Sequence, residues 1–240
     1  VEARLRADQN AALLEPLAIT ADLSAKSDVD RLDSFNVVAK LPGRDPDAGA
    51  LLFLAHWDHL GLCRAQGAPD RICNGAVDNA SGIAVLIETA RRLADGPPLD
   101  RTVYFVATTG EEIGLLGARK FTEQPPVPLD SIVAAFNLDT VAVGPAGTPL
   151  AIIGRGHTPI AGDVAKVAAS IGRSVAPGDD ANDYLKRQDG WALLEKGVPT
   201  VMANGAFSDG ARIEAFLAGD YHTPDDMLTD ATDLSGAAED

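Results

Sequence analysis

Apolar runs of strand length alternate with amphipathic stretches along most of the chain after Ser34. In residues 81–95, apolar side chains recur at i, i+3, i+4 and i+7, a spacing typical of one face of an α-helix. The strands predicted from continuous apolar runs are 36–41, 51–55, 102–107, 131–138, 150–153 and 199–202. Further helices are predicted over 112–122, 158–171 and 190–196. Strands that alternate with helices of this length predict an α/β sandwich around a mostly parallel sheet.

Residues 1–35 do not follow this pattern, because they are polar and favour helix without a strand-like run. We therefore expect a peripheral N-terminal segment over 1–35 and a single catalytic domain over 36–240. With 240 residues, 46% of them hydrophobic, the chain can bury one sizeable core. The chain starts at Val1 without an initiator methionine, and 234–240 resembles the start of a helix, so we expect a piece of a longer protein.

The net charge of the chain limits the kinds of molecule that it can bind. The formal net charge is -15, which argues against nucleic acid and anionic membranes as partners. No apolar run approaches the roughly 20 residues of a membrane span, and no targeting segment is present to indicate a location. An acidic protein also needs a cation more than usual wherever several carboxylates meet.

The two cysteines, Cys63 and Cys73, lie ten positions apart in a loop that contains glycine and proline. Three states are compatible with this spacing. The pair could form a disulfide that pins the loop, as in an exported protein. It could bind zinc, although better ligands lie nearby, or remain as two free thiols.

Acidic residues and histidines follow three of the predicted strands. His56 and Asp139 each come directly after a strand, and Glu111 and Glu112 lie a few residues after another. Ligands of open α/β sheets bind beyond the carboxyl ends of the strands. The sequence therefore predicts that these side chains meet at one edge of the sheet.

This set of nitrogen and oxygen atoms is suited to zinc, which binds imidazole and carboxylate in proteins. A pair of zinc ions can share a bridging carboxylate. The available ligands are His56, Asp78, Glu112, Asp139 and His222, with Glu111 left over to carry a proton. Taken singly, each has a structural interpretation, such as a core histidine or a helix cap. We interpret His59 as structural or as supporting a ligand, and Asp226 as a cap or turn residue.

Five motifs resemble, in the same order, the motif series of the M28 family of zinc aminopeptidases. They are HWDHLG at 56–61, NGAVDNASG at 74–82, GEEIGLLG at 110–117, NLD at 137–139 and YHTPD at 221–225. The resemblance covers about residues 34–240. It implies a three-layer α/β sandwich with a central mixed, mostly parallel sheet flanked by helices.

The resemblance also implies two zinc ions as cofactors. Asp78 would bridge them. His56 and Asp139 would complete the ligands of one ion, and Glu112 and His222 those of the other.

Three further residues receive roles from the same resemblance. Glu111 would be the general base. It would deprotonate the water that bridges the two metals and pass the proton to the leaving amine. Asp58 would hold the imidazole of His56 in its ligating tautomer. Tyr221 would bind the substrate by donating to the oxyanion of the tetrahedral intermediate.

The function expected from these residues is that of a metal-dependent hydrolase, with an aminopeptidase acting on peptides with a free N-terminus as the favoured interpretation. The alternatives are a glutaminyl-cyclase-like acyltransferase with one zinc, a carboxypeptidase of the same fold, and a non-catalytic relative that has lost its metals. The resemblance and the cysteine pair together favour a secreted or periplasmic protein.

One stretch departs from the family pattern. Members often carry an Arg-Ser-Asp-His run before the last helix of the pocket, whereas this chain has RQDG at 187–190. The serine and the histidine are missing. Because this run lies near the substrate in relatives, the preferred substrate residue is not predicted.

Overall fold

The computed structural model describes residues 24–27, 31–230 and 232–240. Residues Ser34–Asp240 form one compact unit. The peripheral segment predicted over 1–35 lies mostly outside the described residues, so the division into two parts stays a prediction. None of the helices in the described parts is long and apolar enough to cross a membrane.

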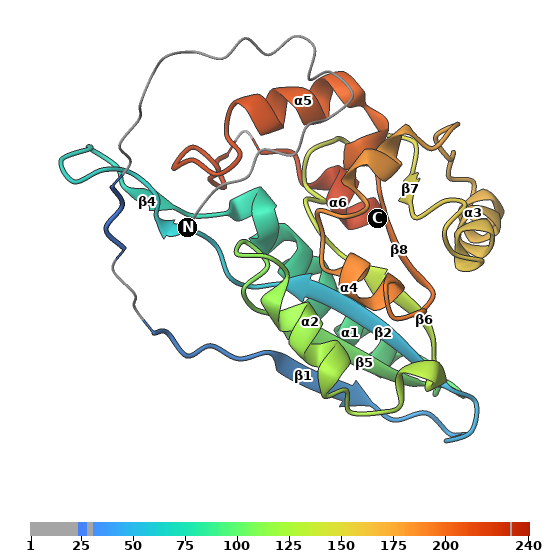
Figure 1. Ribbon diagram of the computed structural model, residues 1–240. Coiled ribbons are helices and arrows are strands. Elements are labelled where there is room, and N and C mark those ends of the chain that lie inside the picture. The colour runs from blue at the N-terminus through green and yellow to red at the C-terminus, as the bar shows by residue number, and fades with distance from the viewer. Residues whose placement is uncertain (1–23, 28–30, 231) are drawn as a thin grey trace, which may run out of the picture. The chain divides into compact units, whose positions relative to one another are not determined.

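Within the described residues, six strands form a mixed sheet (Figure 1). They are β1 (Val37–Leu41), β2 (Ala50–His56), β5 (Thr102–Thr108), β6 (Ile132–Asn137), β7 (Ala151–Ile153) and β8 (Thr200–Asn204). Their spatial order is β1-β5-β2-β6-β8-β7. The four central strands run parallel, and the edge strands β1 and β7 pair antiparallel to their neighbours. The predicted mixed, mostly parallel sheet is thereby confirmed.

Helices cover both faces of the sheet and make the sandwich three layers thick. The main helices are α1 (Gly82–Asp95), α2 (Leu116–Glu123), α3 (Ile160–Ser170), α4 (Gly190–Leu194), α5 (Gly210–Ala218) and α6 (Ser235–Glu239). Short helical turns are η2 (Ala76–Ser81), η3 (Leu129–Ser131), η4 (Asp180–Tyr184) and η5 (Ala206–Ser208). The chain also forms a separate hairpin from β3 (Gly61–Leu62) and β4 (Ile72–Cys73).

The central strand β2 shows why its sequence is a continuous apolar run. Alternate residues of a strand point to opposite faces, and both faces are covered here. Leu52 and Leu54 belong to the core cluster that contains Phe121 of α2. Phe53, on the other face, packs in the cluster that contains Leu86 of α1. A strand buried on both sides cannot alternate apolar with polar residues.

The helix predicted over 112–122 begins later than expected. Residues 111–115 form a turn in which the N–H groups of Gly114 and Leu115 both donate to the Glu111 carbonyl. Leu115 has a left-handed conformation with φ of 59° and precedes the first residue of α2. The acidic pair therefore lies in a turn at the sheet edge and not inside a helix.

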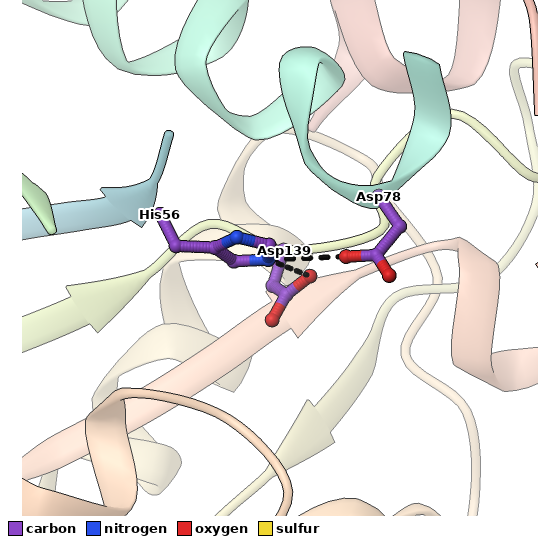
Figure 2. Close-up of side chains that lie close together, drawn as sticks. All are labelled: His56, Asp78 and Asp139. Carbon is purple, nitrogen blue, oxygen red and sulfur yellow. Dashed lines mark hydrogen bonds and ion pairs between the residues drawn. The ribbon is translucent and has the colours of Figure 1, made fainter. Parts of the chain in front are cut away.

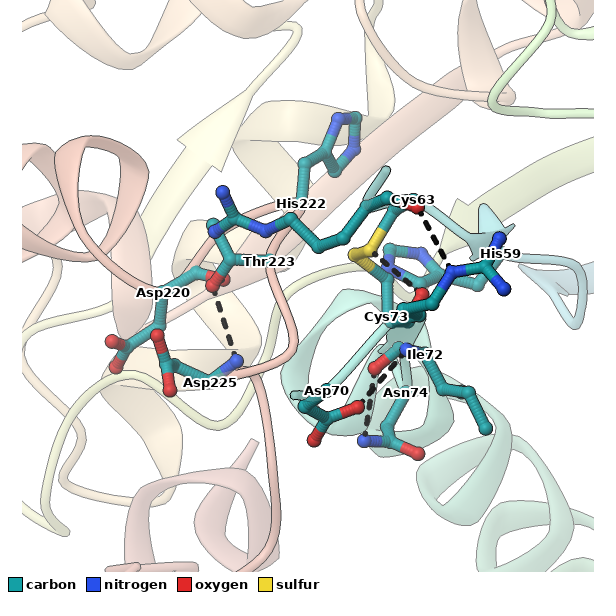
Figure 3. The surroundings of a disulfide bond; sticks show 12 residues. His59, Cys63, Asp70, Ile72, Cys73, Asn74, Asp220, His222, Thr223 and Asp225 are labelled. Atoms are coloured by element: carbon teal, nitrogen blue, oxygen red, sulfur yellow. Dashed lines mark hydrogen bonds between the residues drawn. A yellow bond between two sulfur atoms is a disulfide. The ribbon is translucent and has the colours of Figure 1, made fainter. Parts of the chain in front are cut away.

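A disulfide joins Cys63 to Cys73 and closes the β3–β4 hairpin (Figure 3). The Cys63 N–H donates to the Arg71 carbonyl at 2.9 Å. Of the three states that the sequence left open, the structure therefore has the disulfide. The hairpin begins two residues after His59 and returns just before Gly75, which places it beside the segment discussed next.

We expect Leu54→Ala to lower the free energy of unfolding by about 2–5 kcal/mol, because it leaves a cavity in a fully packed core. Leu54 is 2% exposed. The matched control is Leu62→Ala, since Leu62 is 67% exposed on the hairpin. That control should change stability by less than about 0.5 kcal/mol. Urea unfolding curves of the two variants check this, and equal losses would contradict the proposed core.

Candidate metal centre

The predicted ligands do meet at one edge of the sheet. His56 is the last residue of β2, and Asp139 lies two positions beyond the end of β6. These two strands are parallel neighbours, so their carboxyl ends lie together. Asp78 comes from η2, which leads into α1.

The first group of side chains is His56, Asp78 and Asp139 (Figure 2). His56 Nε2 lies 3.0 Å from Asp78 Oδ1 and 3.8 Å from Asp139 Oδ1. All three residues are buried, and their ligand atoms lie within 4.8 Å of one another. One imidazole nitrogen and two carboxylates converging in this way are a potential cation site.

The second group forms on the other oxygen of Asp78. His222 Nε2 lies 3.2 Å from Asp78 Oδ2 and 2.9 Å from Glu112 Oε2. His59 Nδ1 lies 2.5 Å from Glu112 Oε1. Asp78 thus faces one group with each of its oxygens, as a carboxylate between two cations would. The sequence predicts a structural or supporting residue at His59, whereas the structure places its imidazole against Glu112.

Buried atoms without partners test whether these residues fit a metal. Within the described residues, Glu112 Oε1, His222 Nε2 and both ring nitrogens of His59 are buried and make no hydrogen bond. Leaving such groups unsatisfied is costly. Carboxylate oxygens and imidazole nitrogens that lack donors and point at one another fit a divalent cation, and this donor set suits zinc.

The charges around Asp78 favour a cation as well. Burial lowers the pKa of His56, but contacts with Asp139 and Asp78 outweigh this effect and raise it above its ordinary value. Burial raises the pKa of Asp78, yet His222 and His56 outweigh it and hold that pKa below its ordinary value. The carboxylates therefore create a field that stabilises positive charge at this position.

Two backbone clamps hold the turn that carries Asp78, and the sequence did not reveal either. The carboxylate of Asp226 accepts the N–H groups of Val77 at 2.8 Å and Asp78 at 3.1 Å. Asn79 Nδ2 donates to the Leu138 carbonyl at 2.9 Å and so ties the turn to the end of β6. The sequence predicts only a cap or turn residue at Asp226, since contacts between residues 148 and 149 positions apart leave no local signal.

Glu111 is separate from both groups and faces a pocket. Its neighbours in the pocket wall include Asp78, Asp139 and Tyr221. Burial, reinforced by the charge of Asp139, raises the pKa of Glu111 to about 9. The neighbouring Glu112 points at the histidines instead, so the adjacent carboxylates have different surroundings.

Asp58 contacts His56 in a way that differs from the expectation. The main-chain carbonyl of Asp58, not its carboxylate, lies 3.0 Å from His56 Nδ1. Its Oδ1 is 3.8 Å from that nitrogen and accepts the Glu111 N–H at 3.3 Å. Asp58 therefore contacts both the imidazole and the turn that carries the acidic pair.

Tyr221 lines the same pocket and stacks on His222, with ring centroids 3.7 Å apart. Burial and the charge of Asp78 raise the pKa of the Tyr221 phenol. The hydroxyl therefore keeps its proton and remains a hydrogen-bond donor.

The departure at 187–190 has a structural explanation. Gln188 folds back so that its Oε1 accepts the Gly190 N–H at 2.7 Å and its Nε2 donates to the Leu185 carbonyl at 3.0 Å. A Cβ at position 190 would lie 2.6 Å from Gln188 Oε1 and 2.8 Å from Thr200 Cγ2. The Gln188 side chain thus occupies the space that a side chain at position 190 would need.

Asp189, between these two residues, is fully buried and accepts a hydrogen bond from the Thr108 hydroxyl. Burial raises the pKa of Asp189 to about 7. Because Thr108 pairs with His56 across β5 and β2, this carboxyl lies beneath the ligand-bearing edge.

The sequence is similar to known metalloproteases. Residues 36–238 match the sequence profile of peptidase family M28. A vacuolar membrane protease of Candida dubliniensis is 35% identical over 102 residues, which are 42% of this chain and 10% of the relative. A Pyrenophora teres f. teres protein named "Probable zinc metalloprotease" is 37% identical over 105 residues, 44% of this chain and 22% of the relative. The matches thus span less than a quarter of these relatives.

Solved structures with the same fold include enzymes of two activities. BSAP, a zinc aminopeptidase from Bacillus subtilis, has a TM-score of 0.64 at 20% identity, covering 85% of this chain and 46% of that one. The glutaminyl cyclase of Porphyromonas gingivalis has a TM-score of 0.59 at 23% identity, covering 80% and 69%. These likenesses confirm the three-layer α/β fold.

The expected secreted or periplasmic location is wrong. The curated relatives include several named vacuolar membrane proteases, and that name places those relatives at a membrane of the cell interior. The expectation rested partly on Cys63 and Cys73. A disulfide indicates an oxidising environment in general, so it could not distinguish export from other oxidising surroundings.

The raised pKa of Glu111 predicts how stability of the metal-free protein depends on pH. The folded state keeps a proton that the unfolded chain releases between about pH 4.5 and 9, so the free energy of unfolding should fall as pH rises through this window. Glu111→Gln removes that contribution. In urea unfolding at pH 5, 7 and 9, the variant should lose less stability with pH than the wild type.

The control for this measurement is Glu123→Gln, which changes an exposed carboxylate. Its unfolding free energy should follow that of the wild type at all three pH values. Identical pH slopes for Glu111→Gln and the wild type would show that Glu111 is not protonated in the folded metal-free protein.

Proposed function

The chain belongs to peptidase family M28, and on this premise we propose that it is a two-zinc aminopeptidase that removes N-terminal residues from peptides. Family membership supports the coarser description, a zinc-using metallopeptidase-type hydrolase. The observation that carries the finer proposal is the position of Asp78, whose two oxygens face two separate groups of ligands.

Five residues would hold the metals. One ion would be bound by His56, Asp78 and Asp139, and the other by Asp78, Glu112 and His222. Zinc in this position would act as a Lewis acid toward the substrate carbonyl and would lower the pKa of a water.

Glu111 is the proposed general base. It faces the pocket beside Asp78 and Asp139 without belonging to either ligand group. Its carboxylate takes a proton from the attacking water and gives it to the leaving amine when the peptide bond breaks. Neighbouring cations lower the pKa of a carboxyl, and they would bring the value of about 9 toward the neutral range in which a general base is most effective.

The remaining roles follow from the pocket wall. Tyr221 keeps its proton and can donate to the oxygen of the substrate carbonyl as negative charge develops there. Asp58 contacts the His56 ring through its carbonyl and the Glu111 main chain through its carboxylate. It therefore positions a ligand and the base relative to each other.

The charge of the pocket supports an aminopeptidase. Asp78, Glu111 and Asp139 line it, and carboxylates stabilise the ammonium group of a free N-terminus. Arg187 lines the same pocket and could instead bind a terminal carboxylate. That arginine favours the second candidate function, a carboxypeptidase of the same fold.

A substrate panel tests the proposal. Aminoacyl p-nitroanilides with a free amine should be hydrolysed, and their N-acetyl counterparts should react at least about 10²-fold more slowly because the acidic pocket loses its ammonium partner. A chelator should abolish the activity, and added Zn²⁺ should restore it. Cleavage of N-blocked peptides with a free C-terminus would favour the carboxypeptidase, and conversion of N-terminal glutamine to pyroglutamate would favour a cyclase.

We expect Glu111→Gln to lower kcat by about 10²–10⁴-fold, the range for loss of a general base. Zinc content should stay at the wild-type level, because Glu111 is not among the ligands. Rates and metal content are measured on the same preparation, with Glu123→Gln as the control. A variant that keeps a near-normal rate would show that another group removes the proton.

A further inference from the structure

His59 lies in the second group of ligands but has no role in the function proposed above. Its side chain is 9% exposed. Both ring nitrogens are buried, and in the part of the chain that the structure describes neither makes a hydrogen bond. A neutral imidazole carries one donor and one acceptor, and leaving both unsatisfied costs free energy. Apart from its close contact with Glu112, the ring therefore lacks the hydrogen-bond partners that a structural histidine has.

The polar atom next to His59 is a carboxylate oxygen that is also buried without a hydrogen bond. His59 Nδ1 lies 2.5 Å from this atom, Glu112 Oε1. Glu112 Oε2 lies 2.9 Å from His222 Nε2, and the two imidazole rings meet edge to face at 5.6 Å. The carboxylate of Glu112 thus has one imidazole nitrogen against each oxygen. The ligand atoms of His59, Asp78 and Glu112 lie within 4.8 Å of one another.

The chain around His59 leaves the ring little freedom. A Cβ at Gly75 would lie 2.6 Å from His59 Cγ, so the main chain of the next segment packs directly against the imidazole. The β3–β4 hairpin joins these two segments, and the Cys63–Cys73 disulfide closes it beside His59 and His222 (Figure 3). A ligand that is fixed before the metal arrives loses little entropy on binding.

From these contacts we propose that His59 is a further protein ligand of the zinc ion assigned to Asp78, Glu112 and His222. The inference rests on the proposed two-zinc site. With His59 as a ligand, the two metal sites differ, because one ion would be bound by four protein side chains and the other by only three. Four protein ligands complete a tetrahedral zinc site, whereas three leave a position open.

The pocket wall agrees with this inequality. Of the described ligands, Asp78 and Asp139 line the pocket together with Glu111, and Asp139 belongs to the group with three side chains. The other four ligands, His56, His59, Glu112 and His222, are absent from its wall. The open position therefore belongs to the ion held by His56 and Asp139. The ion held by His59 would have the fuller set of protein ligands, and it should therefore bind more tightly.

The first test counts histidines. The chain has four, and His157 is exposed in a loop. In protein labelled with ¹⁵N-histidine, adding Zn²⁺ to the metal-free wild type should shift the ring nitrogen signals of His56, His59 and His222 and leave His157 unchanged. His59→Asn removes one of the three shifted signals and so assigns it. A wild-type spectrum in which only two histidines shift overturns the proposal.

The second test measures affinity. Zn²⁺ titration in competition with a chromogenic chelator should show two ions of unequal affinity in the wild type. His59→Asn should weaken the tighter ion at least about tenfold and leave the weaker one unchanged, whereas the matched control His157→Asn should change neither. Wild-type constants in the His59→Asn variant overturn the proposal, and the histidine count on the wild type decides the matter if that variant does not fold.

These results separate the inference from the proposed function. A protein that binds zinc through three histidines but hydrolyses no peptide would overturn the proposed activity and keep His59 as a ligand. An active peptidase in which only two histidines respond to zinc would do the reverse.

Discussion

The carboxylate of Asp78 lies between two imidazoles, and the rest of the site depends on its staying there. Its oxygens lie 3.0 Å from His56 Nε2 and 3.2 Å from His222 Nε2. A buried carboxylate persists only with positive or hydrogen-bonding partners, so the two groups of ligands stabilise it from both sides. The surrounding main chain is fixed in turn by Asp226, which accepts two N–H groups of the same turn. Both groups of candidate ligands thus converge on one short turn before α1.

Two further buried carboxyl groups lie near the candidate ligands. Glu111 and Asp189 are both carboxyls whose pKa burial raises, to about 9 and about 7. The charge of Asp189 adds to the rise in the pKa of Glu111. Such a cluster is unfavourable without positive charge, and a protein of net charge -15 supplies little of it elsewhere. Repulsion between the ionised carboxylates destabilises the metal-free protein, and the same repulsion therefore favours the binding of divalent cations.

The sequence predicted the sheet and the gathering of the side chains that follow its strands, because hydrophobic period and position at a strand end are local signals. His56 and Asp139 could be placed at one edge for this reason. Contacts between segments that are far apart in the chain could not be predicted, because they leave no local pattern in the sequence. The Asp226 clamp joins residues far apart in the chain, and the role of His59 depends on how the hairpin folds against Gly75. The start of α2 was misplaced because the acidic and apolar residues at 111–115 resemble the first turn of a helix, whereas Gly114 and Leu115 adopt positive φ.

The distance along the chain between Asp78 and its clamp has a consequence for biosynthesis. Asp226 stands 148 positions after Asp78, and His222 lies only just before it. On a ribosome that adds about 5–20 residues per second, Asp78 is synthesised about 7–30 seconds before Asp226. A cation that bound during this interval would have only part of the proposed set of ligands, because His222 would still be missing. With the proposed zinc ligands, loading of the metal would therefore be a late step in the maturation of this protein, after all six strands of the sheet have been translated.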